Sequence, residues 1–237
     1  MSDALESHLH RQLEQSREFF WQRVRWRAVR EFLPAGGPFT FVDVGAGIGL
    51  AGHYLREDRP QAQYRFVEPL ESLVTHLEAE FGREANLNAA AHYDGAGYLA
   101  LLDVLEHQEN DFTFMAELAA RMDPGATIVV TVPALPSLWS GWDTALGHYR
   151  RYRKNTLRAP IEAAGLRVQE LSYLFPEMIP AGLLRKRRRA ADVDQSAEFP
   201  DLPPLVNQAF IALGSATSAA RKVWPAGTSV IGVAVKP

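Results

Sequence analysis

Three glycines and two carboxylates near the start of the chain have the types and the spacing of a nucleotide-binding turn. Gly45, Gly47 and Gly49 directly follow a short apolar run and precede a stretch of helix-forming residues. Glycine at such a turn can adopt a positive φ and lets a ligand approach the backbone closely. The helix that follows presents unpaired N–H groups at its N-terminus. Asp43 stands two residues before the first glycine, and Glu68 ends the next apolar run.

The glycine spacing separates two classes of nucleotide site. Dinucleotide dehydrogenases use G-x-G-x-x-G after their first strand. The third glycine of that pattern would fall at position 50, where this chain has Leu50. The spacing present is G-x-G-x-G, which disfavours a nicotinamide-dependent oxidoreductase.

The segment from Val42 to Gly49 resembles the first motif of the class I S-adenosylmethionine-dependent methyltransferases. In that family the loop lies along the methionine part of the cofactor, and an acid at the end of the second strand accepts hydrogen bonds from the ribose hydroxyls. Glu68 stands at that place. The D-V-L-E-H run at 103–107 and the M-D-P-G turn at 122–125 are similar to later family segments. The resemblance implies S-adenosylmethionine as cofactor, bound by Asp43, Gly45, Ala46, Gly47, Gly49, Glu68, Pro69 and Asp103.

Two departures from the family pattern are visible. Ala96 and Gly97 stand where the family often has an aromatic residue and an aspartate. The acid that contacts adenine after the third strand is also not evident, and His92, Tyr93 and Asp94 are the local candidates.

The loop from residue 133 to residue 152 is dense in side chains suited to an acceptor substrate, and it resembles a D…G-H-x-R-R-Y pattern in a bacterial branch of the family. We interpret His148 as a general base, because an imidazole exchanges protons near neutral pH, and Asp143 as the group that orients it. We predict substrate contacts from Trp139, Trp142, Tyr149, Arg150 and Arg151. The arginines are equally suited to ion pairs between loop and core, and the tryptophans to packing.

A metal-assisted reaction is an alternative hypothesis. Asp103, Glu106, His107 and His148 resemble the carboxylates and histidines that bind Mg²⁺ in small-RNA 2′-O-methyltransferases. A divalent ion there would acidify an acceptor hydroxyl. Asp103 departs from that set, because those enzymes have glutamate at its position. The leading hypothesis therefore assigns no metal ligands.

The alternation of apolar runs and helix patterns predicts a doubly wound α/β fold with a mostly parallel, seven-stranded sheet. Expected strands are residues 39–44, 64–67, 85–87, 98–102, 127–132, 167–173 and 229–235. Expected helices cover residues 50–58 and 70–81. A third helix is capped by Asn110 and has the inner face Phe112, Met115, Leu118 and Met122. A fourth is capped by Asn155 and ends at Gly165. We expect one domain of 237 residues: an N-terminal helical cap (1–36) with Phe20, Val24, Ala28 and Phe32 on its apolar stripe, a cofactor-binding core (37–174), an inserted helical cap (175–225) and a final strand (226–237).

Composition narrows the remaining classes. The hydrophobic share of 47%, the charged share of 22% and the net charge of −3 are those of an ordinary globular protein. The acidic net charge disfavours nucleic acid as a partner. We interpret the basic run at 185–189 as a solvated face, with docking on a membrane surface as a lesser alternative. Cysteine is absent, no apolar run reaches the roughly 18 residues of a membrane span, and no signal peptide is recognised, so we expect a cytoplasmic protein.

The sequence therefore predicts an S-adenosylmethionine-dependent methyltransferase acting on an oxygen or nitrogen of a small molecule. A scaffold that retains the fold and the cofactor without catalysis is the non-enzymatic alternative. The acceptor is not specified by the sequence, and a homodimer is left open.

Overall fold

Six strands form one sheet in the described part of the chain, residues 17–186 and 202–237 of the computed structural model. The order across the sheet is β2-β1-β3-β4-β6-β5. Pairs β1–β2, β1–β3 and β3–β4 are parallel, whereas β6 is antiparallel to both β4 and β5. The strands are β1 (Thr40–Val44), β2 (Gln63–Val67), β3 (Tyr98–Leu102), β4 (Thr127–Pro133), β5 (Arg167–Leu174) and β6 (Ser229–Val235).

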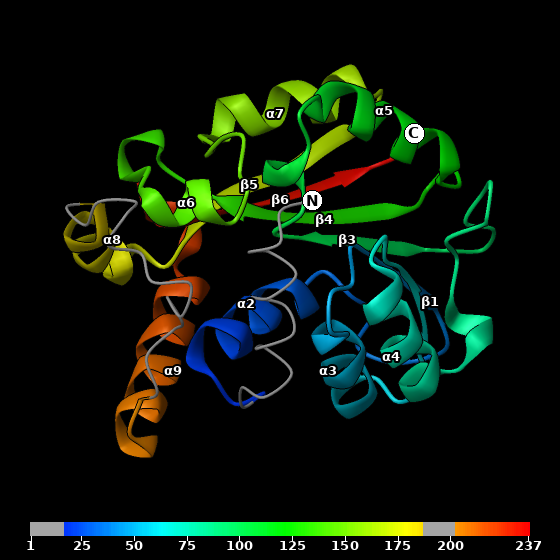
Figure 1. Ribbon diagram of the computed structural model, residues 1–237, viewed down its shortest axis with the longest axis horizontal. Coiled ribbons are helices and arrows are strands. Elements are labelled where there is room, and N and C mark those ends of the chain that lie inside the picture. Colours follow the sequence, from blue (N-terminus) through cyan, green and yellow to red (C-terminus); the bar gives the residue numbers. More distant parts are fainter. Residues whose placement is uncertain (1–16, 187–201) are drawn as a thin grey trace.

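Helices cover both faces of the sheet (Figure 1). One face carries α5 (Asp111–Arg121) and α7 (Lys154–Ala163), and the other carries α2 (Phe20–Arg30), α3 (Leu50–Asp58) and α4 (Glu71–Phe81). Helix α2 lies between α3 and the long α9 (Pro204–Ala219), while the short α6 (Gly141–Ala145) and α8 (Ile179–Lys186) lie near one end of the sheet. The 3₁₀ turns are η1 (Arg83–Ala85), η2 (Leu105–His107), η3 (Pro136–Leu138), η4 (Pro176–Met178) and η6 (Arg221–Val223).

Side-chain alternation along the strands divides the core into two layers. In β4, Ile128, Val130 and Val132 face the α5–α7 side, whereas Val129 faces the side of α2 and α3. The same alternation places Val42 and Phe41 of β1 in opposite layers. Both layers are apolar because a sheet covered by helices on both faces is buried on both faces.

The sequence predicts most element bounds within one residue, and it fails at three places. The expected seventh strand at 85–87 is a single bridge between Phe66 and Asn86. The Asn86 Oδ1 atom accepts a hydrogen bond from Asn88 N at 2.9 Å and turns the chain away from β2, as asparagine side chains do in turns. Among the described residues the sheet thus has six strands.

The other two failures concern helix faces and caps. Asn155 lies inside α7, which begins one residue earlier; Arg153 precedes the helix and donates its backbone N–H to Thr156 Oγ1 at 2.8 Å. Phe112 is 49% exposed, whereas the other three residues of its predicted inner face, Met115, Leu118 and Met122, are buried as expected. The predicted Asn110 cap is confirmed, since its side chain accepts Thr113 N at 3.0 Å.

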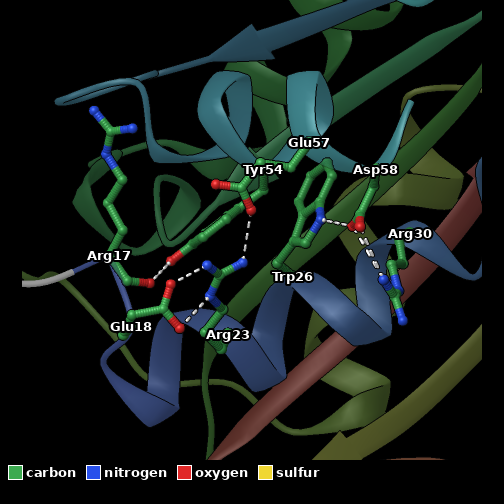
Figure 2. Close-up of polar contacts among 8 residues, drawn as sticks. All are labelled: Arg17, Glu18, Arg23, Trp26, Arg30, Tyr54, Glu57 and Asp58. Carbon is green, nitrogen blue, oxygen red and sulfur yellow. Dashed lines mark hydrogen bonds and ion pairs between the residues drawn. The ribbon is translucent and has the colours of Figure 1, made fainter. Parts of the chain in front are cut away.

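Polar contacts fasten α2 to α3 (Figure 2). Asp58 at the end of α3 accepts hydrogen bonds from Trp26 Nε1 at 2.7 Å and from Arg30 Nη1 at 3.1 Å. Arg23 pairs with Glu57 at 2.9 Å, and its guanidinium lies 4.8 Å from the centre of the Tyr54 ring. The N-terminal helix is therefore tied to the helix that follows the glycine loop.

No helix in the described ranges is long and apolar enough to cross a membrane.

We predict that Asp58→Ala lowers the free energy of unfolding by about 1–3 kcal/mol, because the buried Trp26 indole N–H loses its acceptor. Urea unfolding followed by circular dichroism measures this change. Asp94→Ala is the matched control, since the Asp94 side chain is 92% exposed. Equal stability of Asp58→Ala and the control would show that the contacts in Figure 2 do not hold α2.

Candidate functional site

The glycine loop joins β1 to α3 in a conformation that glycine alone adopts readily. Gly45, Gly47 and Gly49 have φ angles of 75°, 57° and 76°. Gly45 N donates to Val67 O at 2.7 Å, which ties the loop to the end of β2. A Cβ atom on Gly45 would lie 2.6 Å from a methyl group of Val104, so the loop approaches the chain after β3 as closely as glycine permits.

Glu68 lies buried at the end of β2, as its position in the sequence predicts. Its two carboxylate oxygens accept hydrogen bonds from Gly47 N at 2.8 Å and Leu70 N at 2.9 Å. Burial raises the pKa of Glu68, and the two backbone hydrogen bonds oppose that rise. Asn88 fixes the Glu68 backbone from both sides, accepting its N–H and donating to its carbonyl, each at 2.8 Å.

Asp43 lies within β1, below the loop, and is buried. Tyr64 donates its hydroxyl to Asp43 Oδ2 at 2.9 Å. Burial raises the pKa of Asp43 to about 7, although the Tyr64 hydrogen bond and the charge of Arg25 lower it. The carboxyl therefore sits close to its protonation midpoint near neutral pH.

Asp103 follows β3 with a φ of 61°, an unusual conformation for a residue with a side chain. Its carboxylate accepts a hydrogen bond from Thr131 Oγ1 at 3.2 Å and forms an ion pair with Arg25 of α2. Arg25 also donates to Gln22 Oε1 at 2.6 Å. Sequence reasoning missed Arg25, because the apolar stripe of the N-terminal helix gives no signal for a charged side chain on another face.

The loop from residue 133 to residue 152, called the acceptor loop below, is organised around the buried carboxylate of Asp143. Asp143 accepts hydrogen bonds from Ser140 N at 2.9 Å and Arg151 Nε at 2.7 Å, and its Oδ1 lies 3.1 Å from His148 Nδ1. Burial alone raises the pKa of Asp143, but the hydrogen bonds from His148 and Arg151 outweigh it and hold the pKa at about 2. The predicted pairing of Asp143 with His148 is present in the structure.

A second cluster lies beside this pair. The His107 and His148 rings are 4.6 Å apart and nearly perpendicular, and Glu106 is buried next to them. Ligand atoms of Glu106, His107 and His148 all lie within 4.8 Å of one another. Glu106 Oε2 is buried and has no hydrogen-bond partner among the described residues. Burial and the nearby Asp103 charge raise the pKa of Glu106 well above its usual range.

One cavity of about 1240 Å³ joins the glycine loop to the acceptor loop. Seven of the eight residues predicted to bind the cofactor line it, and the exception is Gly49, the last residue before α3. Of the predicted acceptor residues, Trp142, His148, Tyr149 and Arg151 line the cavity. Asp143 does not line the cavity, but it contacts His148, which does.

Two predicted substrate contacts lie outside the cavity. Arg150 pairs instead with Asp111 at 2.7 Å, at the start of α5, which matches the alternative of a loop-to-core ion pair. Trp139 does not line the cavity, whereas its neighbour Leu138 does. The candidate adenine contacts do not line it either, because His92 and Asp94 pair with each other at 3.1 Å and Tyr93 is packed in the core. Asn88, which the sequence did not single out, lines the cavity.

A family model described as a methyltransferase domain matches residues 5–171, more than half of the chain. The chain belongs to this family. Comparison with curated protein sequences gives no significant match. The match ends within β5, so the family model covers the glycine and acceptor loops of this methyltransferase and leaves α8 and α9 outside.

Solved structures of methyltransferases share the fold. An S-adenosylmethionine-dependent methyltransferase from Archaeoglobus fulgidus is 15% identical with a TM-score of 0.56, over 94% of this chain and 96% of that one. A geranyl diphosphate C-methyltransferase from Streptomyces coelicolor is 14% identical with a TM-score of 0.59, over 90% and 78%. Phosphoethanolamine N-methyltransferase 2 from Haemonchus contortus is 14% identical with a TM-score of 0.59, over 92% of this chain and 53% of its own, so this chain spans about half of that protein. The chain thus has the class I methyltransferase fold.

We predict that Asp43→Asn removes part of the pH dependence of stability. The ordinary pKa of 3.8 applies to Asp43 in the unfolded chain, and the folded pKa is about 7. The folded state therefore keeps a proton that the unfolded state loses, so the wild type is destabilised as the pH rises from about 4 to about 7. The raised pKa adds stability below this range, and that contribution disappears above it.

Urea unfolding at several pH values measures this effect. Between pH about 4.5 and about 6.5, the wild type should lose roughly 2–3 kcal/mol relative to Asp43→Asn. Asp94→Asn serves as the control, because the Asp94 side chain is exposed. Parallel curves for the wild type and Asp43→Asn would contradict the assignment of a protonated Asp43.

Proposed function

We propose that this methyltransferase moves a methyl group from S-adenosylmethionine to an oxygen or nitrogen of a small-molecule acceptor. The observation that carries the proposal is the single cavity that connects the glycine loop and Glu68 to the Asp143–His148 pair. A donor held at one end and an acceptor held at the other would share one enclosed space. Such placement converts a bimolecular reaction into an effectively unimolecular one.

The residues around the glycine loop suit the donor. Glu68 is fixed by backbone N–H groups and keeps further lone pairs, with which it would accept hydrogen bonds from ribose hydroxyls. The glycine backbone would lie along the methionine part, near Asp103 and Arg25. When bound, S-adenosylmethionine supplies an electrophilic methyl group on a positively charged sulfur.

His148 suits the role of general base for a hydroxyl acceptor. Its Nδ1 faces the Asp143 carboxylate, so the tautomer with its proton on Nδ1 leaves Nε2 as the proton acceptor. The acceptor oxygen would form its new bond to the methyl carbon as the carbon–sulfur bond breaks, and its proton would pass to Nε2. An amine acceptor that is already neutral would need alignment more than this base.

A second candidate, metal-assisted O-methylation, is favoured by the unpartnered Glu106 Oε2 beside two imidazoles. Glu106, His107 and His148 would hold the ion, which would supply acidification of the acceptor hydroxyl. Asp103 of the sequence-derived set is paired with Arg25. The remaining set of two imidazoles and one carboxylate suits Mn²⁺ or Zn²⁺ better than Mg²⁺, which prefers oxygen ligands.

We predict that Glu68→Ala weakens the binding of S-adenosylmethionine at least about tenfold, because two charge-assisted hydrogen bonds to the ribose are lost. Calorimetric titration with S-adenosylmethionine, its demethylated product and NAD measures this. Glu117→Ala, an exposed glutamate on the far face of the sheet, is the control. Binding of NAD alone by the wild type would overturn the proposed function, and unchanged affinity in Glu68→Ala would remove Glu68 from the ribose.

We predict that His148→Ala lowers kcat with a hydroxyl acceptor by roughly 10²–10⁴-fold with little change in cofactor affinity, because the general base is lost while the glycine loop is intact. The acceptor for this assay comes from a screen of phenols, sugars, amines and carboxylates for release of S-adenosylhomocysteine. His76→Ala on α4 is the matched control.

Glu106→Gln and EDTA separate the two candidate mechanisms. A metal-assisted reaction would be abolished by EDTA, restored by Mn²⁺ or Zn²⁺, and lost in Glu106→Gln. Full activity in EDTA would exclude the metal, and full activity in His148→Ala would exclude both roles of this histidine.

A further inference from the structure

The backbone of Glu106 is fixed to the acceptor loop. Glu106 belongs to η2, which follows β3, and its carbonyl accepts a hydrogen bond from Tyr149 N at 2.8 Å. The preceding residue, Leu105, is fully buried, and its carbonyl accepts a hydrogen bond from the Tyr152 hydroxyl at 3.3 Å. Glu106 also lines the cavity. The main chain therefore holds this carboxyl group in one place beside the cavity.

The Glu106 carboxyl group has no ion-pair partner within the described ranges. The charges of Arg25 and Arg151 reach it. Arg25, however, pairs with Asp103. Arg151 pairs with Asp143 at 2.7 Å. Glu106 Oε2 has no hydrogen-bond partner in the described part of the chain, although the residue is only 1% exposed.

A buried carboxyl group of this kind selects among ligands. A ligand that excludes water from Glu106 without replacing the hydrogen bonds leaves a buried polar group unpaired, which weakens binding. A site built to hydrogen-bond a substrate group therefore rejects an analogue that lacks this group far more strongly than an apolar pocket rejects a missing methylene. The unpaired Oε2 thus indicates that the acceptor brings a polar group to pair with it.

The short distance to His148 limits where this polar group lies on the acceptor. Ligand atoms of Glu106, His107 and His148 all lie within 4.8 Å of one another. An acceptor hydroxyl that gives its proton to His148 is therefore beside the Glu106 carboxyl group. A second polar group on the neighbouring atom is within reach of Glu106, whereas one on the opposite side of a ring points away from both residues.

We propose that Glu106 determines acceptor specificity by binding a hydroxyl or amino group on the atom next to the one that carries the methylated group. The acceptor class is thus a molecule with two neighbouring polar groups, such as a catechol or a 2-aminophenol. The inference deepens the proposed methyl transfer and rests on it. It holds for either charge of Glu106, because a carboxylate accepts a hydrogen bond from O–H or N–H, and the protonated acid can also donate one.

Matched small ligands test this specificity. The protein loaded with S-adenosylhomocysteine is titrated calorimetrically with phenol, hydroquinone, catechol and 2-aminophenol, always in EDTA. Catechol and 2-aminophenol should bind at least about tenfold more tightly than phenol, because each adds a hydrogen bond to a buried carboxyl group. Hydroquinone should bind like phenol, since its second hydroxyl lies on the opposite side of the ring. Equal affinities for catechol and hydroquinone, or no binding of any of the four compounds, would overturn the proposal.

Variants of Glu106 assign the preference to this side chain. Glu106→Leu should remove the preference for catechol over hydroquinone, and its binding of S-adenosylhomocysteine shows that it is folded. Glu106→Gln should keep most of the preference, because an amide also donates and accepts hydrogen bonds. Glu109→Leu is the matched control, since Glu109 is exposed and lies outside the cavity. A preference that persists in Glu106→Leu would contradict the role of Glu106, and the comparison of ligands in the wild type stands without any variant.

The same titrations distinguish a metal site and a failure of the proposed function. A preference for catechol that appears only when Mn²⁺ replaces EDTA, and that is lost in Glu106→Gln, would make Glu106 a metal ligand instead. A wild type that does not bind S-adenosylhomocysteine would contradict the proposed function. Binding of S-adenosylhomocysteine without a preference for catechol would contradict only the specificity assigned to Glu106.

Discussion

The ion pair between Arg25 and Asp103 joins the N-terminal helix to the end of β3. It matters because four carboxylates, those of Asp43, Glu68, Asp103 and Glu106, line one cavity. Parallel strands place them there, since the carboxyl ends of β1, β2 and β3 meet at one sheet edge. The positive charge of Arg25 lowers the pKa of both Asp43 and Glu106 and so offsets part of the mutual repulsion.

The position of Arg25 depends in turn on the contacts between α2 and α3. Asp58 accepts hydrogen bonds from both Trp26 and Arg30 (Figure 2). These two residues follow Arg25 by one and five positions in α2. Helix α3 begins at the glycine loop and ends at Asp58, so one helix follows the loop and holds α2 beside the cavity. The expected N-terminal cap of residues 1–36 is thus, in its described part, a wall of the site. Its removal would expose the carboxylates and not only an apolar surface.

The sequence predicts the donor half of the site because its signals are local. Gly45, Asp43 and Glu68 are recognised from a few neighbouring residues and from the ends of apolar runs. Arg25 and Asn88 could not be found in this way, because each owes its role to a partner 78 or 20 residues away. The expected seventh strand failed for a similar reason: the Asn86 side chain, which turns the chain, has no counterpart in a β-propensity pattern.

Prediction from the sequence has the same limit within the acceptor loop, where it concerns single neighbouring residues. The residues of the loop predict the contact of His148 with Asp143 but do not separate Arg151, which contacts Asp143, from Arg150, which contacts Asp111. Adjacent residues point to different partners because the chain at this position runs between α5 and the cavity. The walls formed by α8 and α9 lie beyond the residues that the family model matches, whereas the glycine loop and Glu68 lie within them.

The two candidate mechanisms compete for one atom. Asp143 occupies the Nδ1 side of His148, which leaves Nε2 as the ring nitrogen for chemistry. A metal bound at Nε2 would prevent that nitrogen from taking a proton, so His148 cannot serve as base and ligand in the same turnover. In the proposed metal site Glu106 would bind the ion as a carboxylate, whereas burial and the charge of Asp103 raise its pKa well above the usual range and favour the neutral acid.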